Sequence, residues 1–194
     1  MSLYLVRHGR TAWNVAGKAQ GWTDEPLDDL GRAQAATLPS TFDGLRIERV
    51  VSSPLGRAVA TATPLVGVRG LPIETIDALK ERGFGRWEGR HFTDVRERFR
   101  AEGGDADLVR PPGGESFEDV MARLEAVVDT LDDRPTVVVT HGGTLSCLVP
   151  RLIGGDLRIR HAFTFANAGI TELRRQEDGR WRIARLNDVA HLEG

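Results

Sequence analysis

The sequence predicts an α/β fold, a three-layer α/β/α sandwich whose central sheet is largely parallel. Short apolar runs typical of buried strands alternate with segments of helical periodicity, the order found where helices cover both faces of a parallel sheet. Two of these strands end in the same dipeptide, His8-Gly9 and His141-Gly142. If the two strands are neighbours, both histidines lie near one crevice, because ligands bind outside the carboxyl ends of parallel strands.

The first half of the chain is expected to alternate between strand and helix. The apolar run at 3–6 predicts a strand, and the long aperiodic segment after it predicts an ordered loop. Ser53 is expected to cap the second helix, with Pro54 at its first position. The remaining elements expected here are helices at 30–38 and 55–63 and strands at 47–52 and 72–76.

The second half is expected to continue the alternation and to end in a hairpin. Residues 79–89 are punctuated by glycine and have no clear period, and Ser116 is expected to cap a long amphipathic helix. No linker or low-complexity tract divides the chain, so we expect a single domain, 1–194, with a cap insertion at about 90–115. The other elements expected are a charged helix at 93–100, a loop at 110–115, a strand at 136–140, a helix at 144–153 and paired strands at 168–173 and 181–186.

Composition excludes several classes of protein. The 194 residues include 26 Lys and Arg against 28 Asp and Glu, a net charge of −2 without the basic excess of a nucleic-acid binder. No apolar run approaches the roughly 20 residues of a membrane span, and no signal peptide is recognisable. The lone cysteine, Cys147, cannot form an internal disulfide and is expected to be a small buried hydrophobe. We expect a cytoplasmic protein without nucleic-acid or membrane partners.

Two arginines accompany the histidines. Arg7 precedes His8 at the end of an apolar strand and needs a partner there, and Arg57 lies in the first turn of its helix, where backbone N–H groups favour anions. Two imidazoles and two guanidiniums suit a phosphoryl group, with one neutral histidine as nucleophile and a second, protonated one as a further donor. The alternative is that each histidine only ends its strand and that Arg57 is a solvated surface residue.

A phosphoryl-transfer site also needs an acid for the departing alkoxide and a base for water. Glu81, just before a Gly-Phe-Gly segment, is the candidate, although a plain surface carboxylate explains its position as well; Glu88 and Asp24 are weaker candidates. The basic run 158–161 is interpreted as a solvated face. Surface or structural roles are expected for three histidines without metal-ligand spacing: His91, His161 and His191.

These blocks resemble, in order, the motifs of the histidine phosphatase superfamily, also called phosphoglycerate mutase-like proteins. The opening Arg-His-Gly signature is matched at 7–14, the second arginine motif at 52–58, the acid-bearing loop at 79–89 and the second histidine motif at 139–143. Segments 20–27, 30–35, 112–116 and 167–170 resemble further family segments, so the resemblance covers most of the chain.

The resemblance implies a phosphomonoesterase that acts on small phosphorylated metabolites. His8 would become phosphohistidine, Arg7, Arg57 and His141 would complete the phosphate pocket, and Glu81 would donate the proton. The substrate side would be lined by Asn14, Gln20, Gly21 and the backbone at Gly142. No metal and no organic cofactor is implied, and the partner is a small-molecule phosphomonoester.

The phosphatase branch is favoured over the mutases, because the chain is short and its acid loop reads Glu-Arg-Gly-Phe rather than Glu-Arg-His-Tyr. A cofactor-dependent phosphoglycerate mutase and a non-catalytic module that binds a phosphorylated ligand remain as alternatives. Arg10 stands where relatives often have an acidic residue. It would join the substrate-binding residues if it faces the pocket mouth, and a solvent-facing loop arginine is the other reading. The oligomeric state, monomer or homodimer, is left open.

Overall fold

The computed structural model describes residues 1–101 and 109–193. Its six-stranded sheet has the order β3-β2-β4-β1-β5-β6. The pairs β1/β4, β4/β2 and β2/β3 are parallel, whereas β5 is antiparallel to both β1 and β6. The strands are β1 (Ser2–Arg7), β2 (Arg49–Ser52), β3 (Ile73–Thr75), β4 (Thr136–Thr140), β5 (Ile170–Arg175) and β6 (Trp181–Asp188). The predicted sheet is confirmed as largely parallel, and its antiparallel part is the predicted hairpin.

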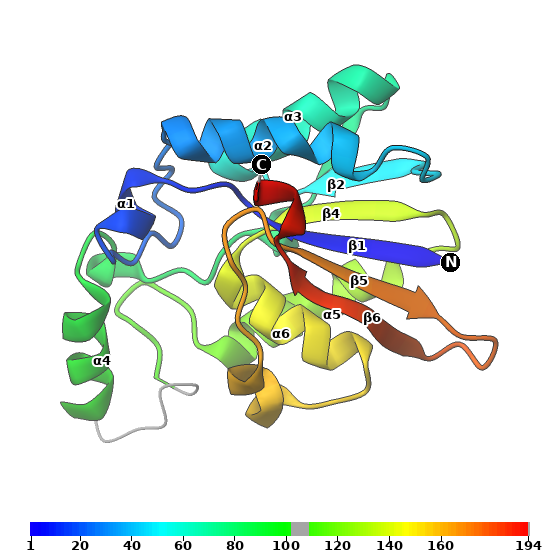
Figure 1. Ribbon diagram of the computed structural model, residues 1–194. Helices are drawn as coiled ribbons and strands as arrows, with labels where there is room; N and C mark the ends of the chain where they lie inside the picture. The colour runs from blue at the N-terminus through cyan, green and yellow to red at the C-terminus, as the bar shows by residue number, and fades with distance from the viewer. Residues whose placement is uncertain (102–108, 194) are drawn as a thin grey trace.

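Helices cover both faces of the sheet, so the three-layer sandwich is confirmed (Figure 1). One pair packs on one face and the other pair on the opposite face: α2 (Asp29–Thr41) with α3 (Gly56–Arg69), and α5 (Phe117–Asp129) with α6 (Gly142–Leu152). Side chains along β1 alternate between two cores, because successive strand residues point to opposite faces. Leu3 and Leu5 belong to the core under α5 and α6, while Tyr4 and Val6 belong to the core under α2 and α3.

The strand register brings the predicted site residues to one edge. Arg7 lies opposite Thr140 in the parallel pair β1/β4, so His8 and His141, the next residue of each strand, leave the sheet side by side. Ser53 leaves the adjacent β2 at the same edge. The two strands that end in His-Gly are therefore neighbours, as the prediction of a shared crevice required.

A smaller cluster packs beyond this edge. Helix α4 (Phe92–Ala101) stands apart from the sandwich (Figure 1) and buries Val95 and Phe99 against Trp87. This helix occupies the first part of the predicted cap insertion, and residues 102–108 of that insertion lie outside the described residues. Among the described helices, none is long and apolar enough to cross a membrane.

Three local expectations were wrong. The second predicted helix, which is α3, begins at Gly56. Its N-cap is Leu55, which makes no side-chain hydrogen bond, so Ser53 does not cap the helix. The segment after β1 is not entirely loop, because a short helix, α1 (Ala12–Val15), interrupts it. The basic run 158–161 lies in a 3-10 turn, Leu157–Ala162, in which Arg160 is buried instead of solvated.

Candidate active site

The two predicted histidines meet at the carboxyl edge of the sheet. The ring centroids of His8 and His141 are 5.1 Å apart, and both side chains are almost fully buried. They come from adjacent parallel strands, so their proximity follows directly from the sheet order. The burial of both rings together, with Arg57 bonded to His141, favours a shared site over the interpretation that each histidine only ends its own strand.

His8 is held as a neutral imidazole with one free ring nitrogen. Its Nδ1 lies 2.7 Å from the carbonyl oxygen of Gly9, and because a carbonyl only accepts, Nδ1 carries the proton. Burial, with the charges of Arg7 and Arg57, holds the pKa of His8 well below its usual value. The lone pair on Nε2 is therefore available near neutral pH, which is the state a nucleophilic histidine requires.

His141 lies among groups that favour its neutral form. Its Nδ1 accepts a hydrogen bond from Arg57 Nε at 3.3 Å, so Nε2 carries the proton and donates to the Ser53 hydroxyl oxygen at 2.8 Å. Burial lowers the pKa of His141, and His8 and the neighbouring arginines lower it further. A phosphoryl dianion among these groups would raise the pKa again, because it offsets the positive charge of the arginines.

Arg57 is fully buried, so the reading as a solvated surface residue is wrong. Its Nη1 and Nη2 donate to the carbonyl oxygens of Thr23 and Gly21 at 2.8 and 2.7 Å, and its Nε bonds to His141. The guanidinium thus fixes the loop after α1 against the second histidine. Gly21 has φ of +54°, and a Cβ there would lie 2.9 Å from the backbone nitrogen of Phe84, so this loop position requires glycine.

Arg7 keeps part of its hydrogen-bonding capacity unused. Its Nη1 donates to the carbonyl oxygen of Phe165 at 2.6 Å, but its buried Nε has no hydrogen-bond partner among the described residues. Burial lowers the pKa of Arg7, and the charge of Glu81 partly offsets this. A buried guanidinium nitrogen without an acceptor is costly, so its position indicates a site for an anion.

A cavity of about 50 Å³ connects these groups. Most of the predicted site residues line it: Arg7, His8, Asn14, Gln20, Gly21, Arg57 and Glu81. Lys18 also lines the cavity, and no sequence signal pointed to it. His141 is not among the lining residues, but it contacts His8 and Arg57. Gly142 does not line the cavity, but a Cβ at Gly142 would lie 3.4 Å from Arg7 Nε, so it packs against that guanidinium.

Glu81 is fixed at the start of α6. Its carboxylate accepts hydrogen bonds from the backbone N–H groups of Gly143 and Thr144, both at 3.1 Å, and from that of Arg82 at 2.9 Å. The indole Nε1 of Trp22 donates to the Glu81 carbonyl oxygen at 2.8 Å. Glu81 lines the cavity that His8 also lines, so it is more than a surface carboxylate.

The two weaker acid candidates have structural partners instead. The Glu88 carboxylate accepts from the backbone N–H groups of Trp22 and Thr23, at 3.0 and 2.9 Å, and joins two loops. Asp24 accepts from the Gly56 N–H at 2.8 Å at the start of α3. Neither residue lines the cavity.

The amide side chains of Asn14 and Gln20 complete the substrate side. Asn167, which lies in the segment before β5, donates from Nδ2 to the carbonyl oxygen of His8 and to Oδ1 of Asn14, both at 3.1 Å. Because Thr11 also donates to Oδ1 of Asn14, the Nδ2 of Asn14 is the group left for a ligand. Gln20 contributes a buried Oε1 without a hydrogen-bond partner among the described residues.

Arg10 is tied away from the cavity. Its Nε donates to the Asp28 carboxylate at 2.7 Å, and Arg10 does not line the cavity of His8. The condition for adding it to the substrate-binding residues, that it face the pocket mouth, is therefore not met in this structure. Lys18 supplies the additional positive charge at the cavity instead.

Comparison with known proteins agrees with this arrangement. The model of the histidine phosphatase superfamily (branch 1) matches residues 3–189. The chain belongs to this superfamily. "Probable phosphoglycerate mutase GpmB" of Yersinia pestis is 31% identical over 205 residues, which cover 100% of this chain and 95% of that protein. The resemblance to histidine phosphatases found in the sequence is thereby confirmed.

Solved structures of superfamily members share the whole fold. The alpha-ribazole phosphatase of Shigella flexneri is 31% identical, with a TM-score of 0.88 over 97% of this chain and 96% of that one. The mycobacterial glucosyl-3-phosphoglycerate phosphatase is 30% identical, with a TM-score of 0.84 over 97% and 99%. The family therefore supports an enzyme that acts on phosphate groups, while its members differ in the alcohol that carries the phosphate.

Proposed function

We propose that this histidine phosphatase superfamily member is a phosphomonoesterase, which hydrolyses small phosphorylated metabolites through a phosphohistidine on His8. The observation that carries the proposal is the hydrogen bond between His8 Nδ1 and the Gly9 carbonyl, which leaves Nε2 as an unprotonated nucleophile. Arg7 and Arg57 line the same cavity. Their charges attract a phosphate dianion to the nitrogen that attacks it.

In the first half of the reaction, His8 Nε2 attacks phosphorus and forms an N–P bond. The bond between phosphorus and the ester oxygen breaks, and its electron pair stays with the oxygen. Glu81, which takes up a proton when the phosphate dianion binds beside it, gives that proton to the oxygen, so the alcohol leaves neutral. Arg7 and Arg57 neutralise charge on the non-bridging oxygens, and His141 gains a proton when the dianion binds and becomes a further donor.

In the second half, water attacks the phosphohistidine. Glu81, now a carboxylate, takes a proton from the water, the N–P bond breaks, and its electrons return to Nε2 of His8. Inorganic phosphate leaves, and both catalytic groups return to their starting states. Asn14 and Gln20 orient the phosphate through their amide groups, and Gly21 keeps the loop close enough for them to do so.

The relatives support this class of reaction and also supply an alternative. Two of the similar structures are phosphatases by name, which favours water as the final acceptor of the phosphoryl group. The Yersinia relative is named as a phosphoglycerate mutase, which favours transfer to a retained phosphoglycerate. Both reactions pass through the same phosphohistidine and differ only in the acceptor.

The mechanism is tested by p-nitrophenyl phosphate turnover in the presence of a chelator. His8→Ala is expected to abolish turnover, and His91→Ala, which changes an exposed histidine bonded to Thr93, serves as the matched control. Undiminished turnover in His8→Ala would reject the phosphohistidine. Calorimetric binding of inorganic phosphate without turnover of any phosphomonoester would favour the non-catalytic module.

Phosphatase and mutase are separated by phosphorus NMR with 3-phosphoglycerate and the bisphosphate primer. Release of inorganic phosphate is expected. Sustained interconversion of phosphoglycerates without net release of phosphate would replace the phosphatase by the mutase while leaving the role of His8 unchanged.

A further inference from the structure

A second and larger cavity, of about 340 Å³, adjoins the cavity of His8. Glu81, Phe84 and Phe92 line both, so the carboxyl group of Glu81 lies where the two meet. In a phosphomonoester the ester oxygen joins the phosphorus to the alcohol. If Glu81 protonates that oxygen while the phosphoryl group lies against His8, the alcohol extends into the larger cavity.

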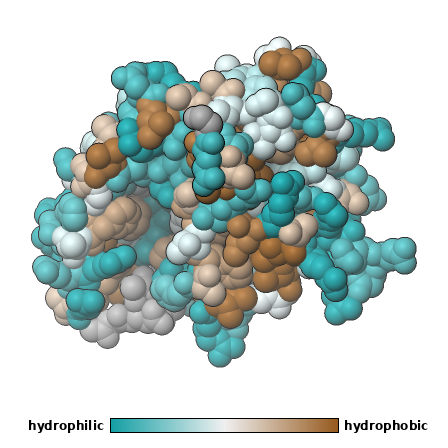
Figure 2. Space-filling model, viewed as in Figure 1, coloured by the Kyte–Doolittle hydropathy of each residue, from teal (hydrophilic) through white to brown (hydrophobic). Residues whose placement is uncertain are grey.

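The walls of the larger cavity are strongly aromatic. Phe84, Phe92, Phe117 and Phe163 line it, and they come from the acid loop, from the starts of α4 and α5, and from the segment after the 3-10 turn Leu157–Ala162. Figure 2 shows a hollow between α4 and the body of the molecule with hydrophobic side chains along it. The hydroxyl of Ser146, another lining residue, is already engaged, because it donates to the Gly143 carbonyl oxygen at 2.7 Å.

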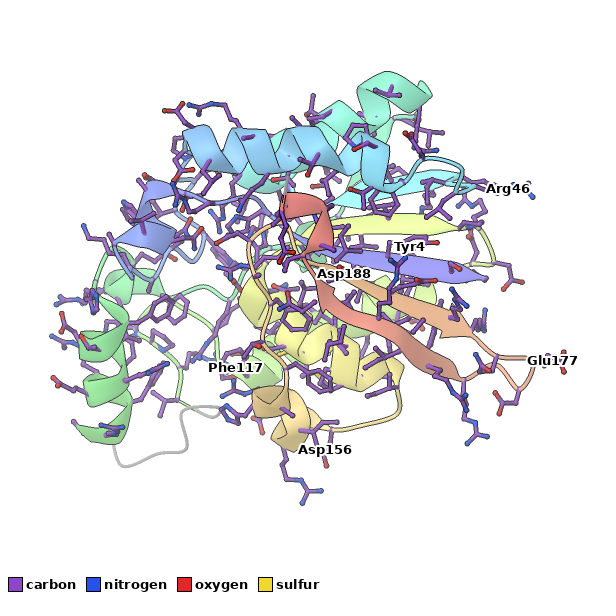
Figure 3. All side chains as sticks on the ribbon, in the orientation of Figure 1. Tyr4, Arg46, Phe117, Asp156, Glu177 and Asp188 are labelled. Atoms are coloured by element: carbon purple, nitrogen blue, oxygen red, sulfur yellow. The ribbon has the colours of Figure 1, made fainter. Side chains whose placement is uncertain are left out.

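The ring of Phe117 is contacted by two guanidiniums. The Cζ atoms of Arg82 and Arg160 lie 4.2 and 3.8 Å from the ring centroid of Phe117, which Figure 3 places on the side of the body that faces α4. Arg82 is fixed in turn, because it donates to the carbonyl oxygens of Glu115 and Val109 at 2.7 and 2.8 Å. Because the two guanidiniums cover the Phe117 ring, the outer guanidinium planes and the ring edge are the surfaces left for another flat group.

A third cavity of about 300 Å³ continues this aromatic region toward α4. It shares Arg82, Phe84, Phe92 and Phe117 with the second cavity and is bounded beyond them by side chains of α4. Cavities of this size accommodate whole ligands, and a short polyol would leave most of the apolar wall in contact with water. The space therefore fits an alcohol with more than one ring.

We propose that the leaving group of the physiological substrate is a planar aromatic alcohol larger than a single ring, held against Phe84, Phe92, Phe117 and Phe163. The inference rests on the proposed phosphatase function and adds the substrate class to it. Phosphates of small polyols, such as glycerol phosphate and 3-phosphoglycerate, then react at the same histidine without using the aromatic walls.

The test compares 2-naphthyl phosphate with phenyl phosphate. The two leaving alcohols have nearly equal acidity, so a difference in kcat/KM reports binding of the second ring. We expect kcat/KM to be at least about tenfold higher for 2-naphthyl phosphate, in line with the selectivity that apolar pockets give for added carbon atoms. Glycerol 2-phosphate is expected to react more slowly than either aryl ester.

Phe163→Ala shows whether the aromatic walls cause the preference. Phe163 is half-buried and packs against the outside of the core under α5 and α6, so urea unfolding of the variant is measured beside its kinetics. We expect the ratio of kcat/KM for the naphthyl and phenyl esters to fall about tenfold in this variant. Leu186→Ala, an exposed hydrophobic change on the edge strand β6, is the control and is expected to keep the wild-type ratio.

The outcomes separate the inference from the proposed function. If phenyl and naphthyl esters are hydrolysed equally well, or if Phe163→Ala keeps the wild-type ratio, the aromatic leaving group is wrong and the phosphatase stands. If no phosphomonoester is hydrolysed, the proposed function is wrong. In that case calorimetry with 2-naphthyl phosphate tests whether the aromatic cavity binds a planar group. Binding that is weakened by Phe163→Ala would support this role of the cavity, and no binding would refute it.

Discussion

Replacing Arg57 by alanine is expected to lower kcat/KM for phosphomonoester hydrolysis by about 10³-fold or more. Arg57 is fully buried and lines the cavity of His8, so its charge acts on the phosphoryl oxygens with little screening by water. Loss of an arginine that stabilises a transferring phosphoryl group costs about 10³–10⁵ in rate. A factor of 10³ corresponds to about 4 kcal/mol of transition-state stabilisation.

The same substitution also removes hydrogen bonds that hold the loop after α1. The carbonyl oxygens of Gly21 and Thr23 would each lose a charged donor, at about 1–3 kcal/mol for each buried acceptor left without a partner. The free energy of unfolding of Arg57→Ala is therefore expected to fall by about 2–6 kcal/mol. Arg57→Lys keeps a positive charge without the planar fork and is expected to lie between wild type and Arg57→Ala in both properties.

The assay pairs steady-state kinetics on p-nitrophenyl phosphate with urea unfolding of the same samples. Arg46→Ala is the control, since Arg46 is exposed and lies at the opposite end of the sheet (Figure 3), and its kcat/KM is expected to stay within about twofold of wild type. A folded Arg57→Ala variant whose kcat/KM stays within tenfold of wild type would refute the role of this guanidinium.

Three further results are expected. The free energy of unfolding in urea should be about 1–3 kcal/mol lower for Gly21→Ala than for Gly44→Ala. Both glycines have positive φ, but only a Cβ at Gly21 meets the Phe84 backbone, so equal stabilities would contradict this close approach. Burial and the adjacent guanidiniums depress the pKa of His8, so its contribution to stability is present above about pH 6.5 and is lost as the pH falls toward the folded pKa. Urea unfolding between pH 7 and 5 should show a shallower loss in His8→Gln, by up to about 1.4 kcal/mol per pH unit, and identical slopes would contradict the depressed pKa. Burial raises the pKa of Cys147 to about 12, so iodoacetamide should alkylate this thiol only after unfolding, and rapid labelling of the folded protein at pH 8 would be the contrary result.

Local patterns predicted the sheet edge well. Apolar strands that end in His-Gly, and an arginine in the first turn of a helix after a strand, are signals within a few residues of one another. The parallel register then brings His8, His141 and Arg57 together without further information. Glu81 was found by similar reasoning, because a phosphoryl-transfer site needs an acid and Glu81 lies in a glycine-punctuated loop.

The misplaced residues depend on contacts between distant segments. Ser53 has the pattern of a helix cap, yet its hydroxyl bonds to His141, 88 positions away. Arg160 lies in a basic run that looks solvated, but its guanidinium stacks on Phe117. The positive charges that lower the pKa of His141 likewise come from several elements, so its neighbours in the sequence do not reveal them.

The aromatic cavity had no signal in the sequence. Its rings lie at positions 84, 92, 117 and 163, and each alone resembles an ordinary core or loop residue. Only the packing of α4 and the 3-10 turn near residue 160 against the body of the molecule brings them together. Local motifs therefore predict the phosphate end of the site, whereas the alcohol end depends on tertiary structure.

Covalent trapping of the phosphoryl group tests the central claim most directly. A rapid quench in base during turnover of p-nitrophenyl phosphate, followed by peptide mass spectrometry, should find the phosphoryl group on the peptide that contains His8. The modified peptide should be absent from His8→Ala and present in His91→Ala. A phosphoryl group on any other residue, or turnover in the wild type without a modified peptide at any quench time, would contradict the phosphohistidine mechanism.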